Sequence, residues 1–124
     1  MTVYGDLILD HWRRPRNKGR LDDPDLDGVA ANPLCGDVVR LQVKLEDGVA
    51  AQVRFDGRGC AISQAAASLL TEMMAGKSRR ELGELGDEDL LDSLGGVVKT
   101  RLSCALLPLR ALRKALAPSA EEGS

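Results

Sequence analysis

Three cysteines carry most of the reactive chemistry in this sequence. Cys35, Cys60 and Cys104 lie far apart along the chain, and each falls where a loop meets a predicted helix or strand. Thiolates bind zinc and iron–sulfur clusters, and as nucleophiles they also carry sulfur. If the fold brings the three thiols together, with Asp37 as a fourth donor, they form a site for metal binding or sulfur transfer.

The sequence around each cysteine favours this reactive role over a place in the hydrophobic core. A free cysteine is often a small buried hydrophobe, and the chain has no C-x-x-C pair. Cys35, however, lies in a Pro-Leu-Cys-Gly-Asp turn, and Cys60 and Cys104 lie near predicted helix starts, where the helix dipole stabilises a thiolate. Asp37 either bonds the backbone of that turn or joins Cys35 as a ligand. Three thiolates and one carboxylate match the ligand number of tetrahedral zinc.

Hydrophobic periodicity predicts the elements that must position these residues. Apolar and polar residues alternate over 38–46 and 49–56, around the turn dipeptide Asp47-Gly48, which predicts an antiparallel hairpin. Residues 15–36, rich in Pro, Gly, Asn and Asp, are predicted to be a long connection, with turns over 22–28. Helices are predicted over about 3–14, 61–75, 79–85 and 87–94, with a last amphipathic helix after Cys104.

Pro108 bears on where that last helix begins. Proline has no N–H to donate to the carbonyl of Cys104, four residues earlier. We therefore expect the helix to begin nearer Leu107, in preference to a distorted first turn beside the Cys104 thiol. Together these elements predict an α+β fold: the hairpin and a short third strand form a small antiparallel sheet, with the N-terminal helix and the C-terminal helices packed on it.

Length and charge favour a single domain over residues 1–124, with a frayed tail over 119–124. The net charge of −2 gives no overall attraction to nucleic acid or membranes. No apolar segment reaches the roughly 20 residues that span a bilayer, and no export signal is evident. We therefore expect a cytoplasmic protein, in which thiols stay reduced and disulfides are rare.

Two polar features receive structural interpretations. His11, the only histidine, is expected to pack or hydrogen-bond within the fold and not to bind metal. The basic run over residues 13–20 is expected to be a solvated face, or a patch that docks an acidic protein partner, in preference to an RNA site. Only Trp12 lies among these charges, so there is no platform for stacking bases.

Four motifs, in order along the chain, resemble those of one protein family. Residues 4–19 (Y-x-x-L-I-x-x-H-W-x-x-P-R-N-x-G) resemble the N-terminal signature of the IscU/SufU/NifU iron–sulfur cluster assembly proteins. Residues 32–37 (N-P-x-C-G-D), 57–63 (G-x-G-C-A-I-S) and 101–104 (R-x-x-C) resemble the three cysteine motifs of that family. The resemblance implies the α+β fold and three cysteines that converge on one surface site.

The resemblance also implies a role in building iron–sulfur clusters. The leading expectation is a zinc protein that accepts persulfide sulfur from a SufS- or IscS-like cysteine desulfurase. It would pass the sulfur to recipient iron–sulfur or SufBCD-like assembly proteins, with no nucleic acid or membrane as partner. Cys35, Asp37, Cys60 and Cys104 would bind the metal. Cys35 is the expected sulfur acceptor, Cys104 is the second choice, and Arg101 is a candidate partner of the thiolate.

Two alternatives stay open at this stage. The same cysteines could hold iron or a transient [2Fe–2S] cluster on a scaffold, or the zinc could be structural in an interaction module. As a sulfur acceptor or as a scaffold, the chain would be a component of an assembly pathway and not a free-standing enzyme. The cysteine site is SufU-like, with Ser103 where the IscU branch has a ligand histidine, but the stretch between Cys60 and Cys104 lacks the insertion typical of SufU.

Overall fold

The computed structural model describes residues 6–33, 36–97 and 99–117. In chain order its elements are α1 (Asp6–Arg13), β1 (Leu26–Asn32), β2 (Asp37–Glu46), β3 (Val49–Arg58), α2 (Ala61–Met74), α3 (Arg79–Gly83), α4 (Asp87–Ser93), the short 3₁₀ helix η1 (Lys99–Arg101) and α5 (Leu102–Leu116). This order confirms the predicted α+β fold. The predicted frayed tail lies outside the described residues. Within them, no helix is both long and apolar enough to cross a membrane.

The three strands form one antiparallel sheet in the order β1-β2-β3. The predicted hairpin is confirmed as β2 and β3, and its turn residues Asp47 and Gly48 both have positive φ angles, of 53° and 81°. Glycine and aspartate tolerate this left-handed conformation, which a tight hairpin turn requires. The residues of β2 alternate between the two faces of the sheet, so that Val39, Leu41 and Val43 are buried.

The third strand lies within residues 15–36, where the sequence predicted a long connection with turns over 22–28. That prediction is wrong for Leu26–Asn32, which pair with β2 over their whole length. Buried and exposed residues alternate regularly along this strand. Its inward positions include Gly28 and Ala30, whose small side chains give little hydrophobic signal. Pairing with β2 and contact with a helix therefore determine a strand that its composition does not indicate.

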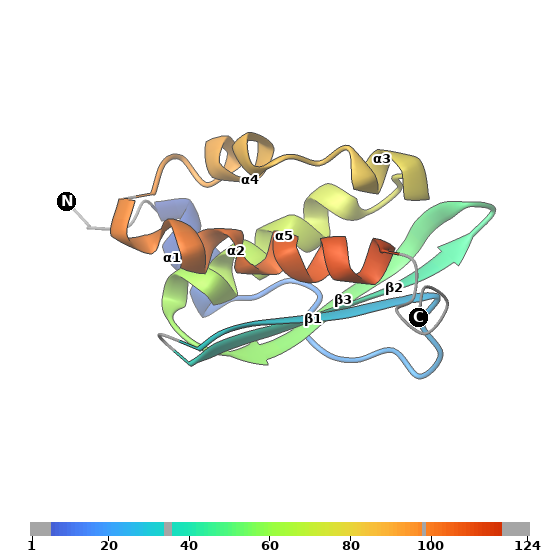
Figure 1. Ribbon diagram of the computed structural model, residues 1–124, viewed down its shortest axis with the longest axis horizontal. Helices are drawn as coiled ribbons and strands as arrows, with labels where there is room; N and C mark the ends of the chain where they lie inside the picture. Colours follow the sequence, from blue (N-terminus) through green and yellow to red (C-terminus); the bar gives the residue numbers. More distant parts are fainter. Residues whose placement is uncertain (1–5, 34–35, 98, 118–124) are drawn as a thin grey trace.

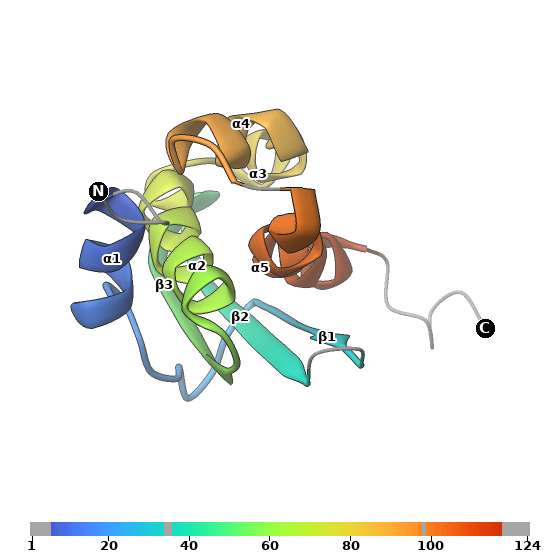
Figure 2. The same ribbon diagram turned by 90° about the vertical axis from the view of Figure 1, so that its left-hand side faces the viewer.

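Helices cover one face of the sheet. Figures 1 and 2 show α2 and α5 lying on that face, with α1 beside α2 and with α3 and α4 on the far side of α2 and α5 from the sheet. Helix α5 comes so close to β1 that a Cβ atom on Gly28 would lie 2.2 Å from the carbonyl oxygen of Ala111. Only glycine allows this approach, which sets the height of α5 above the sheet.

Helix α5 begins five residues earlier than predicted. It runs through Pro108, so the expected start near Leu107 is wrong. An interior proline costs about 3 kcal/mol because it removes one helical hydrogen bond. The early start places Cys104 and Ala105 in the buried stripe that Leu109 and Leu112 continue. Burial of this stripe, at roughly 0.8 kcal/mol per buried methylene, offsets the single lost bond.

His11 ties α1 to α2, which confirms the packing and hydrogen-bonding role expected of it. Its Nδ1 atom lies 2.7 Å from the hydroxyl oxygen of Ser68, and its Nε2 atom lies 3.4 Å from a carboxylate oxygen of Glu72. The Ser68 oxygen also accepts the backbone N–H of Arg16 at 2.7 Å. These contacts suit a neutral imidazole that accepts the Ser68 proton at Nδ1 and donates from Nε2.

Acidification is expected to destabilise the fold through this histidine. Burial, aided by the nearby charge of Arg16, lowers the pKa of His11 below its ordinary 6.5. The unfolded chain therefore takes up this proton at a higher pH than the folded chain, and stability is lost as the pH falls through that interval. We expect wild-type protein to lose more unfolding free energy than His11→Gln between about pH 8 and pH 5.5, measured by urea titration. Equal losses would contradict this account.

Candidate metal centre

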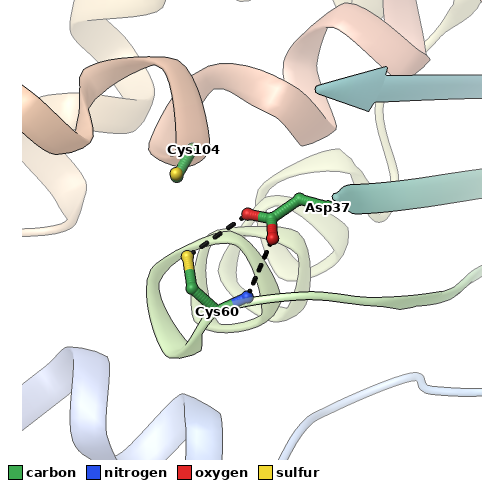
Figure 3. A group of neighbouring side chains, drawn as sticks. All are labelled: Asp37, Cys60 and Cys104. Carbon is green, nitrogen blue, oxygen red and sulfur yellow. Dashed lines mark hydrogen bonds between the residues drawn. The ribbon is translucent and has the colours of Figure 1, made fainter. Parts of the chain in front are cut away.

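Asp37, Cys60 and Cys104 converge at one end of the sheet. One donor atom from each lies within 4.8 Å of the donor atoms of the other two (Figure 3). Asp37 opens β2, Cys60 precedes α2, and Cys104 lies in the first turn of α5. The sequence separates these residues by up to 67 positions, and the antiparallel sheet and the two helices bring them together.

Asp37 binds Cys60 through both of its carboxylate oxygens. Oδ1 accepts the backbone N–H of Cys60 at 3.1 Å, and Oδ2 lies 3.3 Å from the Cys60 sulfur (Figure 3). The Asp37 side chain is turned inward from β2, and the residue is only 2% exposed. A buried carboxylate needs such donors or a cation to offset its lost hydration. In the described structure Asp37 therefore contacts a neighbouring thiol.

Cys60 is the N-terminal capping residue of α2, at the helix start that the sequence predicted. Its φ and ψ angles are extended, at −71° and 165°, and its sulfur accepts the backbone N–H of Ser63 at 3.5 Å. The hydroxyl group of Ser63 donates to the carbonyl oxygen of Cys60 at 3.1 Å and lies 3.9 Å from the sulfur. The sulfur is therefore held at the positive end of a 14-residue helix, beside the N–H of Ser63.

Gly59 is a residue whose importance sequence analysis missed. A Cβ atom at this position would lie 2.3 Å from Oδ1 of Asp37, and the φ angle of 145° is itself strained for other residues. Glycine therefore lets the Asp37 carboxylate approach the start of α2. The Gly-x-Gly pattern before Cys60 indicated a turn. The second glycine is required because the Asp37 side chain, which is distant in sequence, packs against it.

Cys104 is buried, with 3% of its surface exposed, and is the third residue of α5. The residue before it, Ser103, accepts a hydrogen bond of 3.2 Å from the amide of Asn32 at the end of β1. This bond joins the sheet to the first turn of α5, next to the thiol. The sequence did not predict this bond between Asn32 and Ser103, because nothing in their local sequences links the two residues.

Cys35 and Arg101 are the other two predicted site residues. Cys35 lies outside the described residues, so its predicted place in the site stays a prediction. The described residues that flank it are close together, since the N–H of Gly36 donates to the carbonyl of Asn32 at 2.8 Å. Arg101 is exposed at the start of α5, three residues before Cys104.

The donor set fits a soft divalent metal. Zinc–sulfur bonds of about 2.3 Å place the ligands of a tetrahedral ion roughly 3.5–3.8 Å apart. Two thiols and a carboxylate within 4.8 Å of one another need only small side-chain movements to reach that spacing. The combination of sulfur ligands with one carboxylate is typical of zinc and iron, and disfavours magnesium or calcium.

Comparison with known proteins identifies the family. The family model described as NifU-like N terminal domain matches residues 3–121. The chain is 37% identical to the zinc-dependent sulfurtransferase SufU of Bacillus subtilis, over 98% of this chain and 93% of that protein. It is 35% identical to the iron–sulfur cluster assembly scaffold protein IscU 1 of Archaeoglobus fulgidus, over 92% of this chain and 74% of that protein.

A solved structure agrees with these sequence matches. The SUF-system protein FiSufU of Fervidobacterium islandicum superposes with a TM-score of 0.75 at 28% identity, over 93% of this chain and 97% of that one. The alignment with Bacillus SufU spans 143 positions, more than the 124 residues of this chain, so that relative carries residues that have no counterpart here. The chain therefore belongs to the NifU-like N-terminal domain family, which includes the IscU and SufU proteins, as its four motifs predicted.

Proposed function

We propose that this chain is an iron–sulfur cluster assembly protein that binds zinc and accepts sulfur from a cysteine desulfurase in the cytoplasm. The observation that carries the proposal is the convergence of Asp37, Cys60 and Cys104 at the starts of two helices. The similarity to a zinc-dependent sulfurtransferase supports it. Cys35 completes the proposed ligand set, since its Cα is held within about 7 Å of the Asp37 Cα by chain connectivity.

The residues of the site have distinct proposed roles. Asp37 and Cys60 hold each other through two contacts, and Cys104 is buried, so these three are best suited to remain as fixed ligands. Zinc bound to them would keep the thiols ionised and close together. Cys35, which lies between Pro33 and Gly36 in the sequence, is the proposed acceptor. Arg101, beside the first turn of α5, is proposed to pair with the acceptor thiolate when it leaves the ligand set.

The proposed transfer conserves atoms and electrons. The Cys35 thiolate attacks the terminal sulfur of a cysteine persulfide on the desulfurase. A new sulfur–sulfur bond forms on Cys35, the sulfur–sulfur bond of the donor breaks, and the donor cysteine leaves as a thiolate. No external oxidant is needed, because one persulfide replaces another. The product is a persulfide on Cys35, ready for transfer to a recipient assembly protein.

A scaffold role is the second candidate, favoured by the similarity to IscU. Four relatives named as scaffolds are 34–36% identical over at least nine-tenths of this chain. Here the cluster would be cargo, built on the same cysteines and then transferred. Anaerobic reconstitution with iron and sulfide, followed by absorption spectroscopy, separates the two roles. A stable cluster favours the scaffold, and tight zinc with increased desulfurase turnover favours sulfur transfer.

The test of the sulfur-transfer proposal is persulfide formation on the zinc-loaded protein. Wild-type protein is incubated with a SufS-like desulfurase and cysteine. It is expected to increase desulfurase turnover and, in mass spectra, to gain about 32 Da, the mass of one sulfur atom, for each sulfur transferred. Cys35→Ala is expected to lose at least about 90% of both signals, because the attacking thiolate is gone. Ser93→Ala, at an exposed serine of α4 away from the cysteines, keeps all three thiols and is the matched control. Undiminished transfer to Cys35→Ala would show that Cys35 is not the acceptor.

Chelation separates a working metal site from a purely structural one. If zinc only stabilises the fold, its removal should unfold the domain. The described hydrophobic core joins the sheet, α2 and α5, and Cys104 is the only proposed ligand among its buried residues. We therefore expect the chelated protein to keep its circular dichroism spectrum and lose sulfur transfer.

A further inference from the structure

The face of the sheet opposite the helices carries a hollow close to the cysteine site. Its volume is about 350 Å³, and its lining comes from all three strands and the segment before β1. The lining residues are Arg20, Val29, Val38, Arg40, Asp56, Gly57 and Arg58. Val29 is 44% exposed, which makes it one of few large apolar side chains in contact with solvent in the described part of the chain. An exposed apolar side chain beside a charged rim is typical of an interaction surface.

This hollow occupies the part of the outer face that the described segment before β1 leaves open. The chain crosses beneath the sheet before β1, toward the β2–β3 turn (Figure 1). The crossing segment is bound there, since the N–H of Leu21 donates to Gln42 at 2.8 Å and the N–H of Leu45 donates to Asp25 at 2.7 Å. Nearer the cysteine site, Val29 and Val38 line the open hollow.

The strand register places the lining residues in two rows. Val38 is paired with Arg58 in the row nearest the cysteine site, and Arg40 is paired with Asp56 in the next. Val29 is paired with Arg40 from the other side. Partners in such pairs lie on the same face of a sheet. The positions of the apolar and charged strand residues in the lining are therefore determined by backbone pairing and not by loops.

The rim of the hollow has an excess of positive charge. Arg40 is bound by Asp27 through two contacts of 2.9 and 2.6 Å, and Arg20 lies 3.3 Å from Asp56. Arg58 has no carboxylate partner among the residues that the structure describes, and its side chain is exposed. The local charge differs in sign from the net charge of −2 of the whole chain. Because salt screens exposed charges over about 10 Å, this positive patch attracts an anionic surface only at short range.

The hollow and the cysteine site share backbone. Val38 follows Asp37 directly, and Arg58 precedes Cys60 by two residues, so the Cα atoms of Arg58 and Cys60 lie within about 7 Å of each other. A protein bound in the hollow would therefore meet the end of the sheet at which the thiols converge. Such a contact would align the bound protein with this chain for sulfur transfer and would leave the thiols uncovered on the helix side.

We infer that this hollow, with Val29 on one edge strand and Arg58 on the other, docks the sulfur-donating protein through a segment that presents an apolar side chain flanked by carboxylates. This inference rests on the proposed function, because it identifies the chemistry of the donor's docking segment. A small inorganic anion would neutralise Arg58 but leave Val29 exposed and most of the volume empty. A second copy of the chain, related by a two-fold axis, would place arginines against arginines.

Charge reversal at Arg58 tests the inference. Desulfurase turnover is measured against increasing concentrations of zinc-loaded wild-type protein and of Arg58→Glu. We expect the half-saturating concentration to rise at least about 10-fold, because a like-charge contact replaces an attractive one. Turnover at saturation and zinc content should be unchanged. Arg110→Glu, an exposed arginine of α5 on the opposite face, is the matched control and should change half-saturation by less than about 2-fold.

A second variant tests the apolar contact independently of charge. Val29→Ser should raise the half-saturating concentration by roughly 3- to 10-fold, since the buried contact of the two valine methyl groups is lost. Sodium chloride should weaken docking of the wild type more than that of Arg58→Glu. Equal half-saturation for Arg58→Glu and Arg110→Glu would overturn the docking inference and leave the proposed function intact. Failure of wild-type protein to accept sulfur at all would overturn both.

Two other occupants give distinct results. If ultracentrifugation shows that wild-type protein is a dimer and Arg58→Glu a monomer, with no change in half-saturation, the hollow joins two copies and the inference is wrong. If millimolar phosphate competes with the desulfurase for wild-type protein but Val29→Ser has no effect, the hollow is an anion site and the inference is equally wrong.

Discussion

Replacing Cys60 with serine is expected to weaken zinc binding by at least about 100-fold while leaving the fold intact. A four-ligand zinc site contributes roughly 10–16 kcal/mol in total, so one thiolate accounts for several kcal/mol. Serine is a preferred N-terminal capping residue, and its hydroxyl can still accept the N–H of Ser63, so helix α2 should begin as before. The substitution therefore removes the ligand without removing the cap.

Competition with a chromophoric zinc chelator measures this effect, and urea unfolding of the metal-free protein measures the fold. Cys60→Ala is the matched comparison: it should lose zinc to the same extent and also lose about 1 kcal/mol of stability with the cap. If Cys60→Ser retained one equivalent of zinc with wild-type affinity, Cys60 would not be a ligand.

Replacing Gly59 with alanine is expected to damage the site although no ligand changes. The new Cβ atom would lie 2.3 Å from Oδ1 of Asp37, so the carboxylate must move and its two contacts to Cys60 must lengthen. We expect zinc affinity to fall by about 10- to 100-fold, as for the loss of groups that orient metal ligands. Stability should fall by about 2–4 kcal/mol, from backbone strain and steric overlap together.

Gly76→Ala separates these two causes. Gly76 also has a positive φ angle, of 81°, but a Cβ atom there would meet nothing within 4 Å. This variant should lose about 1–2 kcal/mol of stability from strain alone and bind zinc as the wild type does. If Gly59→Ala and Gly76→Ala had the same zinc affinity, close approach of Asp37 to Gly59 would have no part in metal binding.

The two start points of α2 and α5 show how far local sequence predicts the site. Cys60 follows a glycine turn and precedes a regular apolar stripe, so the start of α2 was predicted correctly from neighbouring residues. Pro108 misled the prediction for α5, because proline in a first turn is common and proline inside a helix is not. The buried contacts of Cys104 and Ala105 with the rest of the core outweigh one missing hydrogen bond, and these contacts are not local.

Strand β1 and the docking hollow show the same limit. Small residues such as Gly28 and Ala30 carry no strand signal, yet they allow α5 to lie close to the sheet. The lining of the hollow draws on Arg20 and on three strands, and sequence alone suggested a docking patch only for the basic run that ends at Arg20. Which of those charges faces an open sheet surface depends on where the segment before β1 crosses it.

Sequence alone determined the chemistry available to this protein: the three thiols, the carboxylate after Cys35, the hairpin and the family, because ligand type and periodicity are properties of the chain itself. The tertiary structure decided which of these groups meet. The spacing of Asp37, Cys60 and Cys104, the need for glycine at position 59, and the open face beside Arg58 all arise from strand register and helix packing. These depend on contacts between residues that are distant in sequence, and the free energy of burying the core selects among them.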